Sequence, residues 1–145
     1  MIITQADKYL SKCVRERNNW QCEMCGIISE DGRATCGDRS MQQSHYIGRK
    51  HKATRYMPEN SLCLCARCHA EVEENPHAHN KIYHKVFGEG MAEILNEKKH
   101  QAYKPIGGWK TFEKDAAKHY RQQLKQMRDK RLKGDLGRIE FEGFQ

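Results

Sequence analysis

The chain has 145 residues and carries 26 lysines and arginines against 19 acidic residues, so its formal net charge is +7. With 37% hydrophobic residues and a mean hydropathy of -0.97, it has little apolar surface to bury and no run near the roughly 18 apolar residues of a membrane span. Seven cysteines, an odd number, without an apolar N-terminal segment argue against a secreted disulfide scaffold. We therefore expect a small cytoplasmic protein that is stabilised by a metal, has an anionic partner and does not associate with membranes.

The first part of the chain predicts one clear helix followed by irregular structure. Thr4 and Asp7 have the spacing of a capping box, with Asp in place of the usual Glu or Gln, and apolar residues then recur at helical intervals over about 5–17. Residues 20–43 are rich in Gly, Ser, Asp and Arg, which indicates a knuckle and a loop or hairpin. Residues 45–47 are a short strand candidate.

The rest of the chain predicts a series of helices. After a turn at 58–60, a helix over 62–74 stops before Pro76. Two further helical patterns and a linker follow, at 78–86, 91–102 and 104–108. The last pattern, over about 110–133, is a basic amphipathic helix. Its apolar stripe consists of Phe112, Ala116, Tyr120, Leu124 and Met127.

The positive charge is concentrated in two segments. Residues 110–133 carry 9 basic and 3 acidic side chains, and a shorter block over 49–55 has no acid near it. Lysines and arginines near phosphates release counterions and give sequence-independent affinity for nucleic acid. Both segments therefore predict phosphate contacts, and a solvated charged face is the alternative for either. The predicted contact residues are Arg49, Lys50, Lys52, Arg55, Lys118, Arg121, Lys125 and Arg128.

Two Cys-x-x-Cys pairs, separated by 39 residues, predict a metal site. Two such pairs supply four thiolates, which zinc binds tetrahedrally, and closed sites of this kind are structural. Metal binding would then contribute much of the folding free energy. Buried free thiols or a redox-active pair are the alternative interpretations. The predicted ligands are Cys22, Cys25, Cys65 and Cys68, which leaves Cys13, Cys36 and Cys63 as core or incidental thiols.

Three further residues accompany the cysteines in a distinctive order. His45 and Asn60 lie between the two pairs, and His69 directly follows the second pair. The order Cys-x-x-Cys, His, Asn, Leu-Cys-x-x-Cys-His over about 20–76 resembles the zinc-containing HNH endonucleases of the ββα-metal class. The string SHYIGRKHKATRYMPENSLCLCARCHAEVEENP is more narrowly similar to the phage recombination nucleases of the Rap/NinG type. The resemblance implies an α+β fold, mostly helical, around a ββα-metal core with a basic C-terminal helix.

Phosphodiester hydrolysis requires a base that deprotonates water, a divalent ion that stabilises charge, and groups that hold both in line. A histidine suits the base because its pKa lies near neutral pH. The resemblance assigns this role to His45, and it implies that Asn60 orients the His45 ring or its loop. It also implies that His69 ligates a catalytic Mg²⁺ or Mn²⁺, separate from the zinc.

One position departs from the family pattern. Many relatives have Asp or a second His immediately before the base, whereas this chain has Ser44, whose neutral hydroxyl is a poor ligand for Mg²⁺. Glu73 lies four residues after His69 and would share its helix face, so we expect it to replace the missing ligand. A solvated acid is the alternative for Glu73. The other nearby histidines, which receive no role, are His51, His77, His79 and His84.

The leading hypothesis is a metal-dependent DNA endonuclease that acts on branched DNA, such as a Holliday junction, in phage recombination. Residues 1–104 would form the endonuclease domain, and residues 105–145 a linker, basic helix and tail that contact a second duplex arm or a partner subunit. A homodimer through the C-terminal helix would supply the two symmetric cuts of a junction. The alternatives are a nicking or DNA-packaging nuclease on plain duplex, and a zinc-stabilised DNA-binding module without catalysis, which Ser44 favours.

Overall fold

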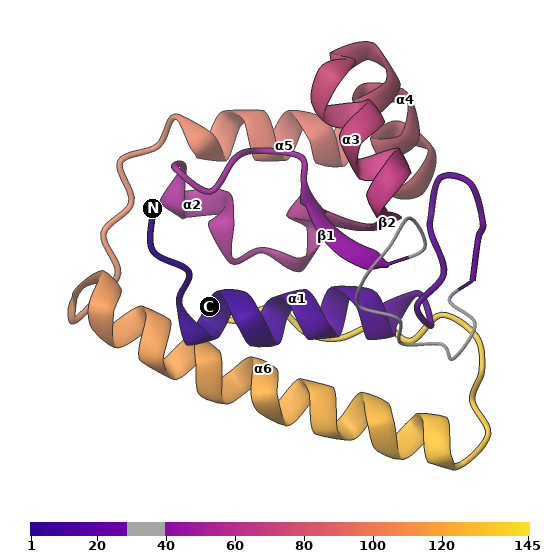
Figure 1. Ribbon diagram of the computed structural model, residues 1–145. Coiled ribbons are helices and arrows are strands. Elements are labelled where there is room, and N and C mark those ends of the chain that lie inside the picture. The colour runs from indigo at the N-terminus through magenta and orange to yellow at the C-terminus, as the bar shows by residue number, and fades with distance from the viewer. Residues whose placement is uncertain (29–39) are drawn as a thin grey trace.

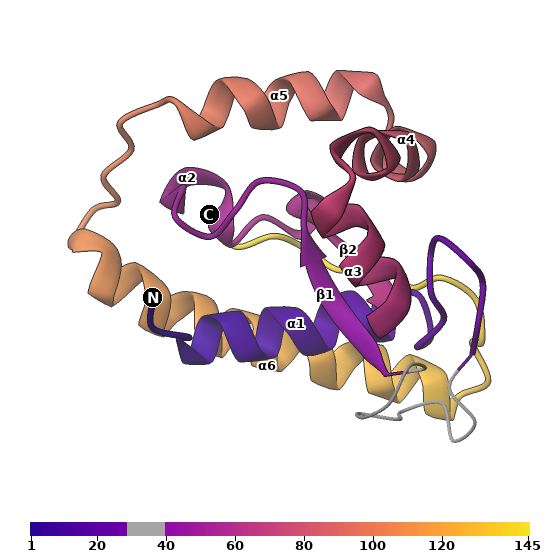
Figure 2. The ribbon, with the colours of Figure 1, turned by 45° about the horizontal axis from the view of Figure 1, so that its top comes forward.

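The computed structural model describes residues 1–28 and 40–145 and shows an α+β structure made mostly of helices (Figure 1). The elements in chain order are α1 (Gln5–Arg17), β1 (Met41–His45), α2 (Lys52–Arg55), a short 3-10 helix (Pro58–Asn60), β2 (Ser61–Cys65), α3 (Ala66–Glu74), α4 (Pro76–Phe87), α5 (Glu89–Lys99) and α6 (Gly108–Leu132). In Figures 1 and 2 the strands lie between α1 and α6 on one side and α3, α4 and α5 on the other. Cys36, one of the predicted spare thiols, falls outside the described residues.

Helix α1 begins and ends as its sequence predicts. The Asp7 N–H donates to Thr4 Oγ1 at 3.1 Å, and the Thr4 N–H donates to Asp7 Oδ2 at 2.8 Å, so the capping box is complete. The helix ends at Asn18, and the next two residues, Asn19 and Trp20, have positive φ values of 52° and 59° that turn the chain away. The buried side of α1 includes Leu10, Cys13 and Val14.

The sheet consists of two antiparallel strands, and it corrects two predictions. β1 pairs with β2 so that Met41 lies opposite Cys65 and His45 opposite Ser61. The strand predicted at 45–47 lies instead at Met41–His45 and shares only His45 with the prediction. The predicted helix over 62–74 begins only at Ala66, because its first residues form β2. β2 is buried at every position. A short apolar run of this kind fits a buried strand or a buried helix equally well, and only the partner strand decides between them.

Helices α3, α4 and α5 form a second layer over the sheet. Pro76 is the first residue of α4, and Asn75 caps it by accepting a hydrogen bond from the Ala78 N–H at 3.2 Å. Gly88, with a φ of 87°, separates α4 from α5, whereas Gly90 lies inside α5. Tyr83 of α4 stacks on Tyr46 with ring centroids 4.0 Å apart. This stack fixes α4 over the loop that follows β1.

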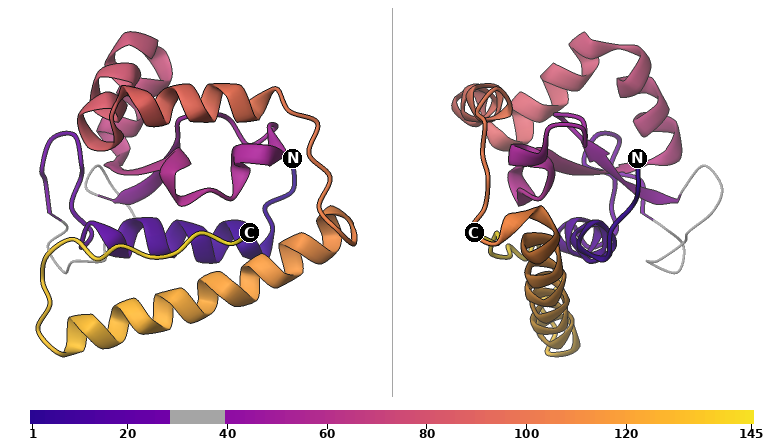
Figure 3. Two further views of the ribbon diagram at one scale, coloured as in Figure 1. Left: turned by 180° about the vertical axis from the view of Figure 1, so that it is seen from behind. Right: turned by 90° about the vertical axis from the view of Figure 1, so that its left-hand side faces the viewer.

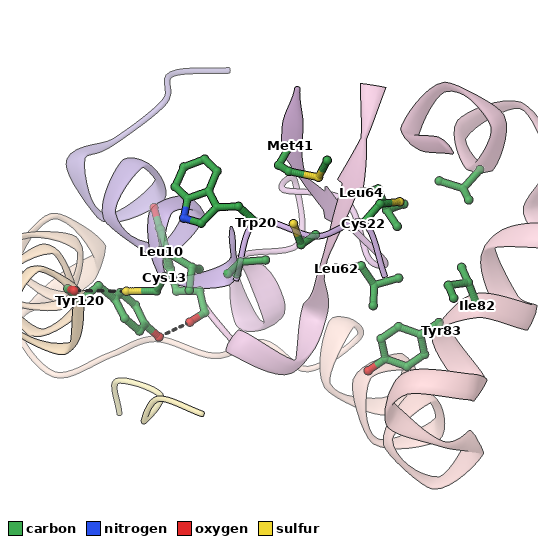
Figure 4. Packing of buried hydrophobic residues seen from close by; sticks show 14 of the residues in the cluster. Leu10, Cys13, Trp20, Cys22, Met41, Leu62, Leu64, Ile82, Tyr83 and Tyr120 are labelled. Atoms are coloured by element: carbon green, nitrogen blue, oxygen red, sulfur yellow. Dashed lines mark hydrogen bonds between the residues drawn. The ribbon is translucent and has the colours of Figure 1, made fainter. Parts of the chain in front are cut away.

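Helix α6 packs along α1 and runs in the same direction (Figure 1). Four residues of its apolar stripe, Ala116, Tyr120, Leu124 and Met127, are buried, and Phe112 is half-buried. The Cys13 thiol donates to the Tyr120 carbonyl oxygen at 3.3 Å (Figure 4). The Tyr120 hydroxyl donates to the Tyr56 carbonyl oxygen at 2.5 Å, and Arg131 forms an ion pair with Glu16 at 3.3 Å. The stripe is therefore covered by α1 and its neighbours within the same chain.

The residues after α6 run back along α1 and α6 (Figure 3). The Ile139 N–H donates to the Arg17 carbonyl oxygen at 3.0 Å, and the Phe144 N–H donates to the Tyr120 hydroxyl at 3.1 Å. Arg17 is itself buried and donates to the carbonyl oxygens of Pro58 and Ser61. The tail thus closes one side of the core. Although α6 has the length of a bilayer span, none of the helices within 1–28 and 40–145 is apolar enough to cross one.

Candidate active site and metal centre

Four cysteine sulfurs gather where the loop after α1 meets the end of β2. The Sγ atoms of Cys22, Cys25, Cys65 and Cys68 all lie within 4.8 Å of one another, and Cys25 Sγ is 3.8 Å from Cys65 Sγ. Four thiolates around zinc, with bonds of about 2.3 Å, form a tetrahedron whose edge is also about 3.8 Å. The cluster could therefore hold a structural metal such as zinc. Among the residues that the structure describes, it is the one group of three or more potential ligands close enough to hold an ion.

Each cysteine pair is shaped by its own backbone. The Cys25 N–H points at Cys22 Sγ, and the Cys68 N–H at Cys65 Sγ, both at 3.5 Å. Gly26, with a φ of 78°, turns the chain after the first pair, and its N–H donates to the Cys22 carbonyl oxygen at 3.0 Å. Cys65 ends β2 and caps α3. The second pair therefore stands at the junction from strand to helix.

The two other described cysteines lie in the core, apart from the cluster. Cys13 and Cys63 are fully buried. Burial raises the pKa of the Cys63 thiol. The Cys63 backbone is held by Glu23, whose N–H donates to the Cys63 carbonyl oxygen at 2.8 Å and whose carboxylate accepts the Cys63 N–H at 2.7 Å. Glu23 also pairs with Arg138 at 2.6 Å, which ties the first cysteine pair to the tail.

A second group of candidate residues lines a hollow of about 450 Å³ beside the sheet, which we call the histidine hollow. It brings together three residues singled out from the sequence, His45 at the end of β1 and both His69 and Glu73 on α3. Its other walls include His79 of α4, Ser44 of β1 and, from the loop after β1, Arg49 and Lys50.

His45 lines this hollow and has an unpartnered ring nitrogen. Its Nε2 is buried, and no group in residues 1–28 or 40–145 forms a hydrogen bond with it. Burial, with a smaller contribution from the charge of Arg49, lowers the pKa of His45 from 6.5 to about 4. The ring is therefore neutral at pH 7. Buried polar atoms are nearly always satisfied, so an orphaned one in a hollow indicates a functional group.

Asn60 holds the loop that follows β1. Its Oδ1 accepts the Ile47 N–H at 2.7 Å, and its Nδ2 donates to the Ile47 carbonyl oxygen at 2.8 Å. Its own carbonyl oxygen accepts the Tyr46 N–H at 2.8 Å. Asn60 is fully buried where the 3-10 helix meets β2. Asn60 was expected to orient either the His45 ring or the loop that carries it, and these contacts favour the loop.

His69 has a partner at each ring nitrogen. Gln42 Oε1 lies 2.7 Å from its Nδ1, and Glu73 Oε1 lies 3.2 Å from its Nε2. The Glu73 side chain is 68% exposed, so the carboxylate is free to turn towards an ion. Ser44, by contrast, is buried in β1 opposite Leu62.

His79 is a candidate that the sequence pattern did not single out. Its Nε2 is also buried, and the described part of the chain offers it no hydrogen-bond partner. Burial and, to a smaller extent, His69 lower the pKa of His79. The ring meets Tyr46 edge to face at 5.4 Å. Only the packing of α4 beside α3 brings His79 to the hollow, so no local signal marks it.

Arg55 is a correction to the predicted phosphate-binding block. Its guanidinium is buried and pairs with the Asp7 carboxylate at 2.6 and 3.1 Å, while a third hydrogen bond reaches the Ile2 carbonyl oxygen at 2.8 Å. Burial alone would raise the pKa of Asp7, but the hydrogen bonds from Arg55 and Thr4 outweigh it and lower that pKa. Arg55 therefore joins α2 to α1 and is not available to a phosphate. Lys50 and Lys52 are exposed.

A groove of about 560 Å³ runs along α1 beside the histidine hollow, and we call it the α1 groove. Gln43, Arg49 and His69 line both. Lys8 and Lys12 are exposed on α1 and line the α1 groove, and their spacing of four residues places them on one helix face. The charge pattern of α1 alone does not distinguish them from ordinary solvated lysines.

The predicted cations of α6 lie on one exposed face. They follow one another at intervals of three and four residues, opposite the stripe that packs on α1. These residues are Lys118, Arg121, Lys125 and Arg128.

Comparisons with protein-family models, curated proteins and solved structures found no match to the chain. The function must therefore be argued from these residues and their geometry.

Proposed function

We propose that the chain is a metal-dependent endonuclease that hydrolyses phosphodiester bonds in DNA, as its resemblance to the HNH class implies. The observation that carries the proposal is the histidine hollow. There, a neutral imidazole with an unpartnered buried nitrogen stands beside a His and Glu pair, with cations in the same walls. The succession β1, β2, α3 has the order of a ββα core, with His45 at the end of the first strand and His69 on the helix.

The residues of the hollow suit a hard divalent ion such as Mg²⁺ or Mn²⁺. Mg²⁺ keeps several waters and is held through one or two protein carboxylates, so Glu73 is the group in this hollow that suits it best, whereas imidazole suits softer ions. His69 and Glu73 would hold it, and the unpartnered Nε2 of His79 would bind one of its waters. This set replaces the acidic ligand that is missing at Ser44. When bound, the ion supplies positive charge to the phosphate and the leaving oxygen.

The side chains of the protein perform the remaining steps. His45, whose ring is neutral at pH 7, accepts the proton of the attacking water at its Nε2. Its lowered pKa makes it a weaker base than an exposed histidine. Asn60 fixes the Ile47 backbone and thereby the loop that continues from His45. Arg49 and Lys50 offer positive charge to the phosphate oxygens, where negative charge grows in the transition state.

We assign the cysteine cluster to zinc with a structural role. Cys68 and His69 are adjacent on α3, so a metal held at the start of this helix fixes the segment that carries His69 and Glu73. The donor set of four thiolates and the 3.8 Å sulfur separation suit tetrahedral zinc. Zinc would thus order the active site without taking part in the reaction.

Branched DNA is the substrate that the charged surfaces favour. The α1 groove offers Lys8 and Lys12 to the strand that enters the hollow, and the exposed cationic face of α6 offers a separate surface to a second duplex arm. A junction resolvase needs two cuts and hence two copies of the active site. Because the apolar stripe of α6 is covered within the chain, a homodimer would have to use another face.

Cleavage assays on matched DNAs test the proposal. A four-way junction, a nicked duplex and a linear duplex of shared sequence are incubated with Mg²⁺, Mn²⁺ or EDTA. We expect metal-dependent cutting of the junction, at least about 100-fold slower in His45→Ala. His100→Ala, at the exposed end of α5, is the matched control and should cut normally.

The other possible results of the cleavage assays would each support a different conclusion. Binding without cleavage under every metal would leave a zinc-stabilised DNA-binding module, as the serine at position 44 suggests. Equal cutting of all three DNAs would favour a nicking or packaging nuclease on plain duplex. Full activity in His45→Ala would reject His45 as the base.

A further inference from the structure

A second hollow, of about 380 Å³, lies apart from the histidine hollow and is lined by aromatic rings. We call it the aromatic hollow. It is bounded by α2, the segment between α5 and α6, the start of α6 and the end of the tail, all of which lie at one end of the molecule (Figures 1 and 2). The rings that line it come from Tyr56, Tyr103, Trp109, Phe112 and Phe144.

The rings form a connected series of edge-to-face contacts. Trp109 contacts Tyr103 at 5.6 Å and Phe112 at 5.2 Å, and Phe112 contacts Phe144 at 5.0 Å. Edge-to-face packing sets the edge of one ring against the face of the next and so holds the rings in fixed relative orientations. Tyr103 is 49% exposed, and Trp109 is only partly buried. The hollow therefore presents flat aromatic surface that solvent can reach.

Two cations and one acidic residue, Glu59, are among the residues that line this hollow. The Lys52 ammonium lies 5.4 Å from the centre of the Trp109 ring, and Lys98 lines the same hollow. Lys52 is exposed and its side chain is long, so it can turn from the ring to a phosphate when another group takes its place. Flat rings inside and cations at the edge are the combination with which proteins bind single-stranded nucleic acid.

The aromatic hollow and the histidine hollow are lined by residues of one short segment. Arg49 lines the histidine hollow and Lys52 lines the aromatic hollow. Three residues of extended chain span at most about 11 Å between Cα atoms. A DNA strand that occupies both hollows therefore has to cross only the short segment between Arg49 and Lys52.

We propose that the aromatic hollow binds an unpaired nucleobase of the DNA that the protein cuts. Bases in a perfect duplex are stacked on both faces, whereas a base at a branch or bulge has a face free to stack on protein rings. This inference rests on the proposed function, and it deepens it by giving a reason to prefer branched DNA over plain duplex. Stacking on Trp109 would select the substrate by its unpaired base and not by its sequence.

The test compares two DNAs that differ only in pairing, in buffer without added divalent ion so that neither is cut. One carries a single unpaired 2-aminopurine, and the other has the same base paired. We expect the protein to bind the unpaired DNA about 5- to 150-fold more tightly, which is the value of one stacked base, and to quench its fluorescence. Trp109→Leu should lose the preference and the quenching, and Trp109→Phe should keep both. Tyr103→Ala, at a more exposed ring, should weaken both without threatening the fold.

Three results would overturn the proposal. These are equal affinity for the two DNAs, a loss in Trp109→Leu that is the same for both DNAs, and an unpaired base that stays bright when bound. Its failure is distinguishable from that of the proposed function. A protein that prefers the unpaired base but never cuts would contradict only the nuclease, and one that cuts and binds both DNAs equally would contradict only the aromatic hollow.

Discussion

The side-chain amide of Asn60 binds the backbone of Ile47 at both of its hydrogen-bonding groups, with 2.7 Å to the N–H and 2.8 Å to the carbonyl oxygen. This buried contact joins Asn60, the residue before β2, to the loop after β1. It thereby fixes the backbone that directly follows His45. A backbone segment held in this way cannot shift without breaking two hydrogen bonds together.

Replacing Asn60 by Ala should therefore impair both stability and activity. Two buried backbone groups would lose their partners, which costs about 2 to 5 kcal/mol. Denaturant unfolding measures this loss, and cleavage is assayed at a temperature where the variant stays folded. Asn96→Ala is the matched control, because its amide makes one hydrogen bond within α5, to the Ala92 carbonyl oxygen. An Asn60→Ala protein as stable and active as the control variant would contradict the role assigned to Asn60.

The lowered pKa of His45 predicts a specific dependence of stability on pH. The folded state keeps the ring neutral down to about pH 4, whereas the unfolded state takes up a proton at about 6.5. The contribution of His45 to stability is therefore present above pH 6.5 and is lost as pH falls towards 4, by an amount on the order of 3 kcal/mol. Denaturant unfolding at pH 7 and 4.5 should show a larger decrease in the wild type than in His45→Asn. Equal decreases would mean that His45 titrates normally.

The cysteine cluster predicts that metal and folding are coupled. Cys25→Ser should remove tightly bound zinc and lower the melting temperature, because ligand binding contributes folding free energy. Cys13→Ala, which changes a buried thiol outside the cluster, should keep its zinc. Elemental analysis of purified protein measures the metal content. Folded wild-type protein without zinc would reject the zinc assignment.

Two basic residues of the same segment should behave in opposite ways. Arg55→Ala breaks a buried ion pair and should destabilise the fold by about 3 to 5 kcal/mol. Lys50→Ala changes an exposed side chain, so it should alter stability by less than about 0.5 kcal/mol. If Lys50 contacts a phosphate, its loss should reduce the salt slope of DNA binding by about 0.9. An unchanged salt slope in Lys50→Ala would mean that Lys50 is an ordinary solvated side chain that does not contact a phosphate.

Local signals allowed part of the fold and site to be predicted. The capping box at Thr4 defined the start of α1, and the paired cysteines indicated a cluster between segments far apart in sequence, because both signals depend on fixed spacing. Helix α2 escaped prediction because it has four residues and no side-chain cap. β2 was not predicted as a strand, because an apolar run of five residues has no periodicity that distinguishes a strand from a helix.

Contacts between residues far apart in the sequence account for the features that could not be predicted. Arg55 appears as one more cation in a basic block until the fold brings it to Asp7, which lies 48 residues earlier. His79 joins the histidine hollow only because α4 packs beside α3. In both cases the function of the side chain depends on a neighbour that no spacing rule connects to it.

The packing of α6 on α1 also determines the order in which the chain can complete its fold as it is made. Cys13 and its partner Tyr120 are separated by 107 residues, and at about 5 to 20 residues per second the ribosome takes roughly 5 to 20 s to travel between them. Throughout that time the apolar side of α1 has no helix to cover it. The last cysteine of the cluster is made well before α6, so a structural metal such as zinc, if the cluster holds one, could bind the growing chain before α6 exists. The bound metal would then stabilise the part of the chain already made, whose core is completed only when α6 packs on α1.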